Sequence, residues 1–145
     1  MIRRFVPKDA APVLVLARSS PGAAQWSEQS YLNLDASGLL GWVADIQGTV
    51  VGFLVIRLIT REAEILNLAV HIDHRRGGVG KRLMSTVMGN LRAAGVNHVF
   101  LEVRESNHSA IAFYEKCGFA RSGRRPDYYR YPNEAAVLMD RILTG

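Results

Sequence analysis

The most constraining feature of this sequence is a glycine-rich loop, Arg75-Arg76-Gly77-Gly78-Val79-Gly80, between two segments of different periodicity. Residues 64–70, before the loop, are rich in β-forming side chains, whereas apolar residues at 79, 83, 87 and 91 follow helical spacing. Glycines let backbone amides come close to a ligand, and the first amides of a helix lack internal partners and carry the positive end of its dipole. The segment therefore predicts a strand–loop–helix unit that can hold an anion.

Positive side chains surround this loop, because Arg75, Arg76 and Lys81 lie beside the glycines. The dinucleotide pattern G-x-G-x-x-G is absent, and Gly80-Lys81 is followed by Arg82, where the G-x-x-x-x-G-K-[ST] pattern requires Ser or Thr. From the residues alone two interpretations stay open: a phosphate cradle, or a strand-to-helix turn with solvated arginines.

The rest of the chain predicts a sheet with helices around it. Gln47-Gly48-Thr49 separates two β-rich runs and predicts a hairpin, and such short turns imply antiparallel strands. Asp9 and Ser27 are suited to cap two early helices, and a later helix begins at about Asn107. A polar, tyrosine-rich loop is expected between the last two strands. The predicted strands are 2–6, 42–46, 50–56, 64–70, 99–103, 119–120 and 135–139. The expected fold class is α/β (α+β), with a mixed, mostly antiparallel sheet flanked by helices.

Length and composition exclude several classes of protein. A chain of 145 residues has the size of one domain, so residues 1–145 are interpreted as a single unit. No run approaches the ~18 apolar residues of a membrane span, and Cys117 has no second cysteine to pair with. We therefore expect a reduced, cytoplasmic protein without a membrane partner. The net charge of +5 favours an anionic ligand, and the four histidines form no metal-binding pattern.

The glycine loop and its surroundings resemble the GNAT superfamily of N-acetyltransferases. Arg75-x-x-Gly78-x-Gly80 matches the (Gln/Arg)-x-x-Gly-x-(Gly/Ala) signature of that family, and residues 67–70, 101–107 and 112–119 resemble its flanking motifs in order and spacing. The resemblance implies an enzyme that uses acetyl-CoA, releases coenzyme A and binds it where the central strands splay apart, with the pyrophosphate on the loop. The cofactor-binding residues that it implies are Leu68, Ala69, Val70, Arg75, Arg76, Gly77, Gly78, Val79, Gly80, Lys81 and Asn107.

Two side chains have the chemistry that amine acetylation requires. An alkylammonium must lose a proton before it attacks a thioester, and Glu102, in an otherwise apolar strand, could accept that proton. The departing thiolate needs a proton, for which the family resemblance implies Tyr114. Simpler interpretations stay open: Glu102 could face solvent or pair with an arginine such as Arg104, Tyr114 could be a packed aromatic, and Asn107 a helix cap. Direct attack in a ternary complex needs no acyl-enzyme.

Within the superfamily, the chain most resembles the ribosomal-protein-alanine N-acetyltransferases. Gln25-Trp26-Ser27-Glu28 resembles their Pro-Trp-Ser-Glu loop, and Arg124-Arg125-x-x-Tyr128-Tyr129 resembles their C-terminal end. The resemblance implies an acceptor contacted by Trp26, Tyr128 and Tyr129, namely the N-terminal alanine of ribosomal protein S18. Gln25 and His71 depart from the family pattern. Other N-termini, lysines or small amines remain alternatives, as does a non-catalytic acyl-CoA sensor. We expect a monomer that does not bind nucleic acid.

Overall fold

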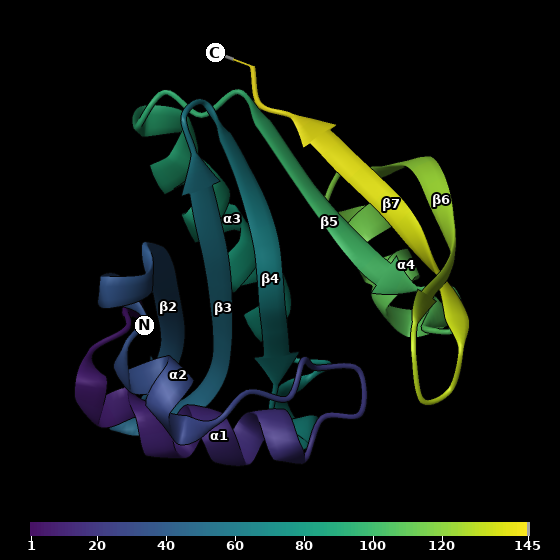
Figure 1. The fold of residues 1–145 in the computed structure, drawn as a ribbon. Helices are drawn as coiled ribbons and strands as arrows, with labels where there is room; N and C mark the ends of the chain where they lie inside the picture. Colours follow the sequence, from purple (N-terminus) through teal and green to yellow (C-terminus); the bar gives the residue numbers. More distant parts are fainter. Residues whose placement is uncertain (145) are drawn as a thin grey trace.

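The fold is a seven-stranded sheet in the order β1-β2-β3-β4-β5-β7-β6. It is seen in a computed structural model that describes residues 1–144 (Figure 1). Every neighbouring pair is antiparallel except β4 and β5, which run parallel. The strands are β1 (Ile2–Arg4), β2 (Leu39–Ile46), β3 (Thr49–Ile59), β4 (Glu62–Val70), β5 (His98–Arg104), β6 (Ala120–Tyr129) and β7 (Glu134–Ile142). The predicted mixed, mostly antiparallel sheet is thus confirmed.

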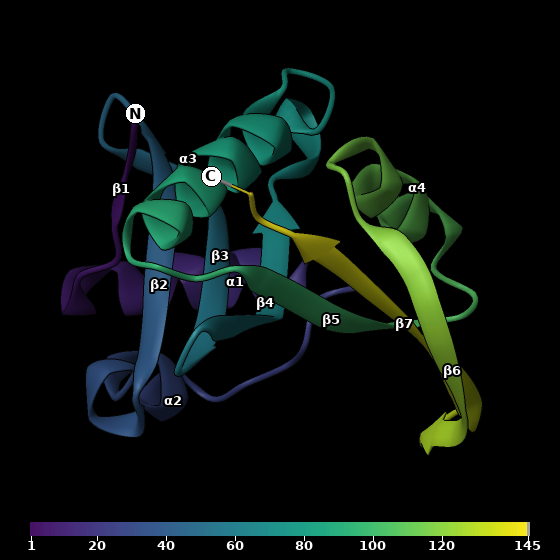
Figure 2. The same cartoon turned by 90° about the horizontal axis from the view of Figure 1, so that it is seen from above.

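Helices cover both faces of this sheet. The first two, α1 (Ala10–Arg18) and α2 (Glu28–Leu32), lie on one face, and α3 (Val79–Ala93) and α4 (His108–Lys116) lie on the other (Figure 2). Three 3-10 turns join the elements at Pro7–Asp9, Asp35–Ser37 and Ile72–His74. The last of these turns leads from β4 through the glycine loop into α3.

The two central strands touch only at one end. Their parallel register runs from Glu62 opposite His98 to Glu64 opposite Phe100, and the strands then separate, as Figure 1 shows. Just past this point β3 pairs Ile56 with Ile65 but Val55 with Asn67, so Leu66 is an extra residue on β4. Such a bulge bends its strand and increases its twist. We call the region where β4 and β5 diverge, residues 65–70 and 101–104, the splay.

The bulge also exchanges the faces to which β4 side chains point. Ile65 packs in the cluster under α3, whereas Ala69 packs in the cluster under α1 and α2. The sequence follows this exchange: Ala63 and Ile65 pack in the cluster under α3 before the bulge, whereas Leu68 and Val70 pack against it after the bulge. One strand therefore supports both layers of core.

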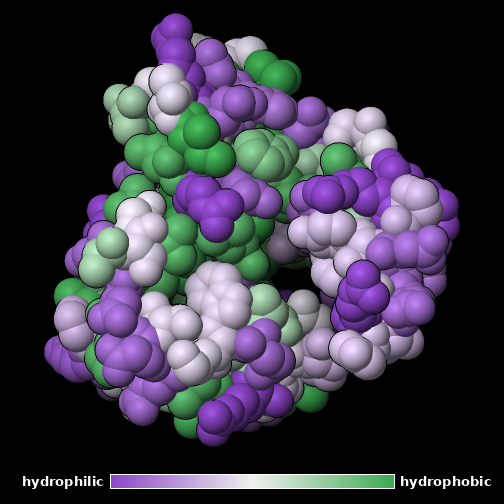
Figure 3. Space-filling view, in the orientation of Figure 1, coloured by the Kyte–Doolittle hydropathy of each residue, from purple (hydrophilic) through white to green (hydrophobic). Residues whose placement is uncertain are grey.

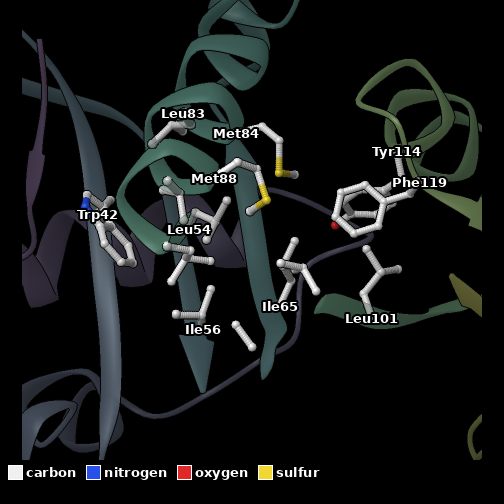
Figure 4. Close-up of a cluster of buried hydrophobic side chains, with 14 of the residues drawn as sticks. Trp42, Leu54, Ile56, Ile65, Leu83, Met84, Met88, Leu101, Tyr114 and Phe119 are labelled. Atoms are coloured by element: carbon white, nitrogen blue, oxygen red, sulfur yellow. The ribbon is translucent and has the colours of Figure 1, made fainter. Parts of the chain in front are cut away.

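The larger core joins α3 to the centre of the sheet. Leu83, Met84 and Met88 extend from α3 onto Leu54 of β3 and Ile65 of β4 (Figure 4). All five side chains are buried, which explains why apolar residues recur on one stripe of α3. This packing fixes the start of α3, and hence the glycine loop, relative to β4.

The structure confirms several local predictions from sequence. The β2–β3 turn places Gln47 at φ 52° and Gly48 at φ 87°, as a tight hairpin turn requires. The Ser27 hydroxyl accepts a hydrogen bond from the Ser30 amide at 3.2 Å and caps α2. The Asn107 side chain caps α4 in the same way, because its Oδ1 accepts from the Ala110 amide at 3.2 Å.

Two local predictions were wrong. Asp9 precedes α1 but its carboxylate does not cap that helix; it accepts two hydrogen bonds from Arg3 at 2.9 Å and one from the Val6 amide at 2.8 Å. Most of the expected polar loop before the last strand is the long strand β6, at the edge of the sheet. Since β6 buries no face, its sequence has no apolar alternation by which it could be predicted.

Candidate active site

The glycine loop presents a row of free amides. Gly78 has φ 79°, and the first backbone bond into α3 runs from the Arg82 amide to the Gly78 carbonyl at 3.0 Å. Among residues 1–144, no backbone carbonyl accepts from the amides of residues 78–81. Their partial positive charge adds to that of the helix dipole, so the loop has the donors that a phosphate group needs.

Close packing explains one of the glycines. A Cβ on Gly80 would lie 3.1 Å from the ring of Phe113 in α4, which is tighter than ordinary van der Waals contact. Gly80 is buried at this contact. A larger residue would therefore push α4 away from the start of α3, on the side of the molecule where Tyr114 lies.

The arginines of the loop have different surroundings. Arg75 Nε donates to the Val70 carbonyl at 2.9 Å and its Nη2 to Ser20 Oγ at 3.4 Å, so this side chain ties the end of β4 to the end of α1. Arg76 and Lys81 are exposed, with no hydrogen bond from either side chain in the described structure. The last two are therefore the cations that are most available to a bound phosphate.

Beyond the bulge, the β4 edge that faces β5 has no strand to pair with, because the parallel register stops at Glu64. Leu68, Ala69 and Val70 lie on this stretch. Asn67, which is buried, anchors it: its amide donates to the Ala24 carbonyl at 3.0 Å and to the Tyr31 hydroxyl at 3.2 Å. A rigid, unpaired strand edge can form β-type hydrogen bonds with an extended ligand.

Two predicted site residues belong to α4, which lies on the opposite side of the splay from β4. Asn107 is the N-cap of this helix, and Tyr114 lies within it. A Cβ on Gly22 would lie 2.5 Å from Asn107 Nδ2, so the loop between α1 and α2 rests against the start of α4. Tyr114 is 8% exposed, burial raises the pKa of its phenol, and its hydroxyl points toward Ile65 of β4 (Figure 4). The phenol is therefore protonated at neutral pH and directed into the splay.

Glu102 is the first side chain on its face of β5 after the strands separate. Its Oε1 accepts a hydrogen bond from Arg125 Nη1 at 3.0 Å, while its Oε2 is buried and has no partner in the described part of the chain. Arg104, which the sequence suggested as a partner, instead donates from Nη1 to Glu134 Oε1 at 3.2 Å. Its guanidinium carbon lies 4.4 Å from the centre of the Tyr129 ring. One carboxylate oxygen thus keeps its hydrogen-bonding capacity unused.

The three aromatic residues predicted to contact the acceptor belong to two separate aromatic pairs. The ring centres of Trp26 and Tyr31 lie 5.4 Å apart. Trp26 also lines a hollow of about 430 Å³, together with Leu66 and Arg57. Tyr128 and Tyr129 are in edge contact at 5.1 Å, and burial raises the pKa of Tyr129 to about 12. Figure 3 shows a deep cleft between the body of the molecule and the β6–β7 hairpin. The structure does not bring Trp26 and the two tyrosines into contact.

Comparison with known proteins identifies this arrangement. Residues 13–119 match the acetyltransferase (GNAT) family. Over 119 residues, which cover 81% of this chain and 80% of the relative, it is 34% identical to the [ribosomal protein bS18]-alanine N-acetyltransferase of Escherichia coli K12. The chain belongs to the GNAT acetyltransferase family.

Solved structures agree with this assignment. The ribosomal-protein-S18-alanine N-acetyltransferase of Escherichia coli superposes with a TM-score of 0.89 at 28% identity, covering 100% of this chain and 94% of the other. Ard1 of Thermoplasma volcanium gives 0.90 at 36% identity, covering 100% and 98%. The GNAT fold predicted from the sequence is therefore confirmed, and the protein is an N-acetyltransferase.

The residues of this GNAT enzyme fit acetyl-CoA, the acetyl donor of the family. The free amides of the loop suit a pyrophosphate, and the unpaired edge of β4 suits an extended arm with amide groups. That each residue makes these contacts stays a prediction. No group of histidine, cysteine or carboxylate side chains within residues 1–144 could hold a metal ion, and no helix there is long and apolar enough to cross a membrane.

Sequence reasoning did not find three contributors to the site. Arg125 could not be matched to Glu102, because the pair depends on how β6 lies beside β7. Asn67 carried a signal, namely a single amide in an apolar strand, but its partner Ala24 is 43 residues away. Gly22 carried no such signal, because its contact with Asn107 depends on the tertiary fold.

Proposed function

We propose that this enzyme acetylates the N-terminal α-amine of a protein, with the N-terminal alanine of ribosomal protein S18 as the preferred acceptor. Two observations carry the proposal: Glu102 Oε2 has no hydrogen-bond partner in the described structure, and a cleft opens between the body of the molecule and the β6–β7 hairpin, to which Glu102 is bonded through Arg125 (Figure 3). An open cleft admits the end of a peptide chain, whereas a small amine needs a closed pocket. The named activity of the bacterial relatives supports the choice of S18.

The proposed chemistry uses one residue on each side of the splay. Bound acetyl-CoA supplies an acetyl thioester, which is activated toward attack by an amine. Glu102 Oε2 accepts a proton from the acceptor ammonium, so that the neutral amine can attack. Tyr114 donates its phenolic proton to the departing sulfur and regains a proton from the attacking nitrogen, which loses its second proton as the amide forms. The backbone of β4 holds the donor in place. Direct transfer in a ternary complex is sufficient, and no residue of the chain needs to carry the acetyl group.

An acceptor assay tests the proposal. Purified enzyme and acetyl-CoA are mixed with a peptide that has the S18 N-terminal sequence, and the release of free thiol is followed. Matched arms contain the same peptide with a blocked N-terminus, a blocked peptide with an internal lysine, an unrelated free N-terminus, and a polyamine. We expect turnover with the S18 peptide, and fragmentation mass spectrometry should place the acetyl group on its first residue.

The other arms separate the alternatives. Turnover confined to polyamines or to the internal lysine would overturn the proposed acceptor but leave the enzyme class intact. Binding of acetyl-CoA without turnover in any arm would favour the sensor. A monomeric state and a cytoplasmic location stay predictions, and size-exclusion chromatography with light scattering tests the first.

A further inference from the structure

The two oxygens of Glu102 have contrasting surroundings. Oε1 lies 3.0 Å from Arg125 Nη1, whereas Oε2 is buried and lacks any donor in the described structure. Leaving a buried acceptor unsatisfied costs about 1–3 kcal/mol, and more for a charged group. This cost is recovered only when something else donates to Oε2, and the side chain is therefore poised for a ligand that carries N–H groups.

Arg125 reaches Glu102 across an intervening strand. In the sheet register Arg125 lies opposite Ala136 of β7, and Ala136 lies opposite Arg104 of β5, whereas Glu102 lies opposite Leu138. The Arg125 side chain must therefore cross β7 and extend two residues along that strand to reach Glu102. Its guanidinium also stacks on the ring of Tyr128 at 4.3 Å, which holds it from the other side.

We propose that Arg125 is the positioning residue of Glu102: it binds one carboxylate oxygen and thereby fixes the other as the receptor for the ammonium of the acceptor. The inference rests on the proposed role of Glu102 as the base. The β6–β7 hairpin then orients the base besides forming a wall of the cleft.

The chemistry of the acceptor explains why such positioning matters. An α-amine has a pKa of about 8, so it arrives largely as an ammonium ion at neutral pH. Its proton must pass to one particular oxygen before the nitrogen can reach the thioester. A free glutamate side chain samples several rotamers, and a misplacement of about 1 Å in a reacting pair can cost about a hundredfold in rate. The bond to Arg125 removes this freedom.

Arg124 provides a matched control on the same strand. It precedes Arg125, so strand alternation directs its side chain to the opposite face, where it bonds Glu105 at 2.6 and 3.1 Å. The two arginine side chains are similarly exposed, 56% for Arg124 and 52% for Arg125. Removing either one deletes one charge and one ion pair of β6, but only Arg125 touches Glu102.

A double-mutant cycle tests the inference. The variants Arg125→Met, Arg125→Lys and Arg124→Met are made in the wild-type chain and in the Glu102→Gln background, and kcat is measured with the S18 N-terminal peptide at saturating acetyl-CoA. In the wild-type chain we expect Arg125→Met to lower kcat about tenfold, within the range for a misplaced reacting group. Arg125→Lys should recover most of the rate, and Arg124→Met should stay within about twofold of wild type.

The decisive comparison is in the Glu102→Gln background. If Arg125 acts through Glu102, Arg125→Met should change the residual rate there less than about twofold. Acetyl-CoA affinity and the melting temperature are measured for every variant, and neither should differ between Arg125→Met and Arg124→Met. A loss that is equal in both backgrounds, or wild-type turnover of Arg125→Met, overturns the inference and leaves the proposed function intact. Wild-type turnover of Glu102→Gln overturns the base role, and with it this inference.

Discussion

The two halves of the sheet are stabilised in different ways. Strands β1–β4 lie between helices, and β3 is buried from Val51 to Ile56. On the other side of the splay, β6 is exposed along nearly its whole length, and the ion pairs of Arg124 and Arg125 link it to residues of and beside β5. The glycine loop is thus fixed by core packing, whereas β6, the outer strand of the hairpin beside the cleft, is held by its pairing with β7 and by surface ion pairs.

This difference implies that donor binding and acceptor chemistry can be altered separately. The loop is anchored through α3, whose stripe of Leu83, Met84 and Met88 lies in the larger core (Figure 4). The hairpin contributes Tyr128 and Arg125 from an edge strand, where substitutions remove little buried area. Changes in the hairpin should therefore alter turnover at unchanged stability, and changes in the loop should alter the affinity for acetyl-CoA.

The largest effect is expected from Glu102, on the acceptor side of the comparison. Glu102→Gln keeps the size of the side chain but removes the proposed proton acceptor, and we expect kcat to fall by at least about a hundredfold. The dissociation constant of acetyl-CoA, measured by calorimetry, should remain within about twofold, because the proposed donor contacts lie on β4 and the loop. Glu105→Gln is the control, since its carboxylate bonds Arg124 on the other face. An equal loss of kcat in Glu102→Gln and Glu105→Gln would contradict the proposed role of Glu102.

A smaller loss is expected from Tyr114, which belongs to α4 but points into the splay (Figure 4). Tyr114→Phe removes only the hydroxyl, so packing against Phe119 at 5.8 Å should persist. A thiol has a pKa of about 8.5, so the thiolate leaves partly without help, and we expect a loss of about tenfold to a hundredfold in kcat. Wild-type kinetics would assign Tyr114 a packing role alone.

The loop side is tested by Arg76, which is exposed and makes no side-chain hydrogen bond in the described structure. Arg76→Ala should weaken acetyl-CoA binding about fivefold and leave kcat unchanged, because one exposed ion pair contributes about 1 kcal/mol or less. The effect should shrink as salt is added. Arg92→Ala, an exposed charge change at the far end of α3, is the control. If both variants weakened acetyl-CoA binding equally, Arg76 would act only through the net charge of the protein and not through a contact with the phosphates.

The same comparison explains what the sequence could predict. The buried half follows local rules: a run of β-forming side chains marks β4, helical spacing marks α3, and Gln47-Gly48 marks the hairpin turn. The hairpin half does not, because β6 buries no face and its partners depend on register across β7. Glu102 and Tyr114 could be named from a family resemblance, but the bond from Arg125 required the tertiary structure.

The smallest effect is expected at the short ladder that joins the halves. His98 bridges them: its Nδ1 lies 2.5 Å from Glu62 of β4 and its Nε2 lies 2.9 Å from Asp140 of β7. These two carboxylates raise the pKa of His98 above its ordinary value of 6.5. A raised pKa in the folded state means that protonated His98 stabilises the fold. That contribution is complete below about pH 6.5, the ordinary pKa of an unfolded histidine, and is lost as the pH rises through the raised pKa.

The free energy of unfolding of His98→Gln, measured in urea, should therefore be lower than that of wild type at pH 6, and the difference should shrink by pH 9. His108→Gln, an exposed residue with no side-chain hydrogen bond or ion pair in the described structure, should show no such trend. A difference that does not change with pH would mean that His98 joins the halves by packing on Phe100, at 5.7 Å, rather than by charge.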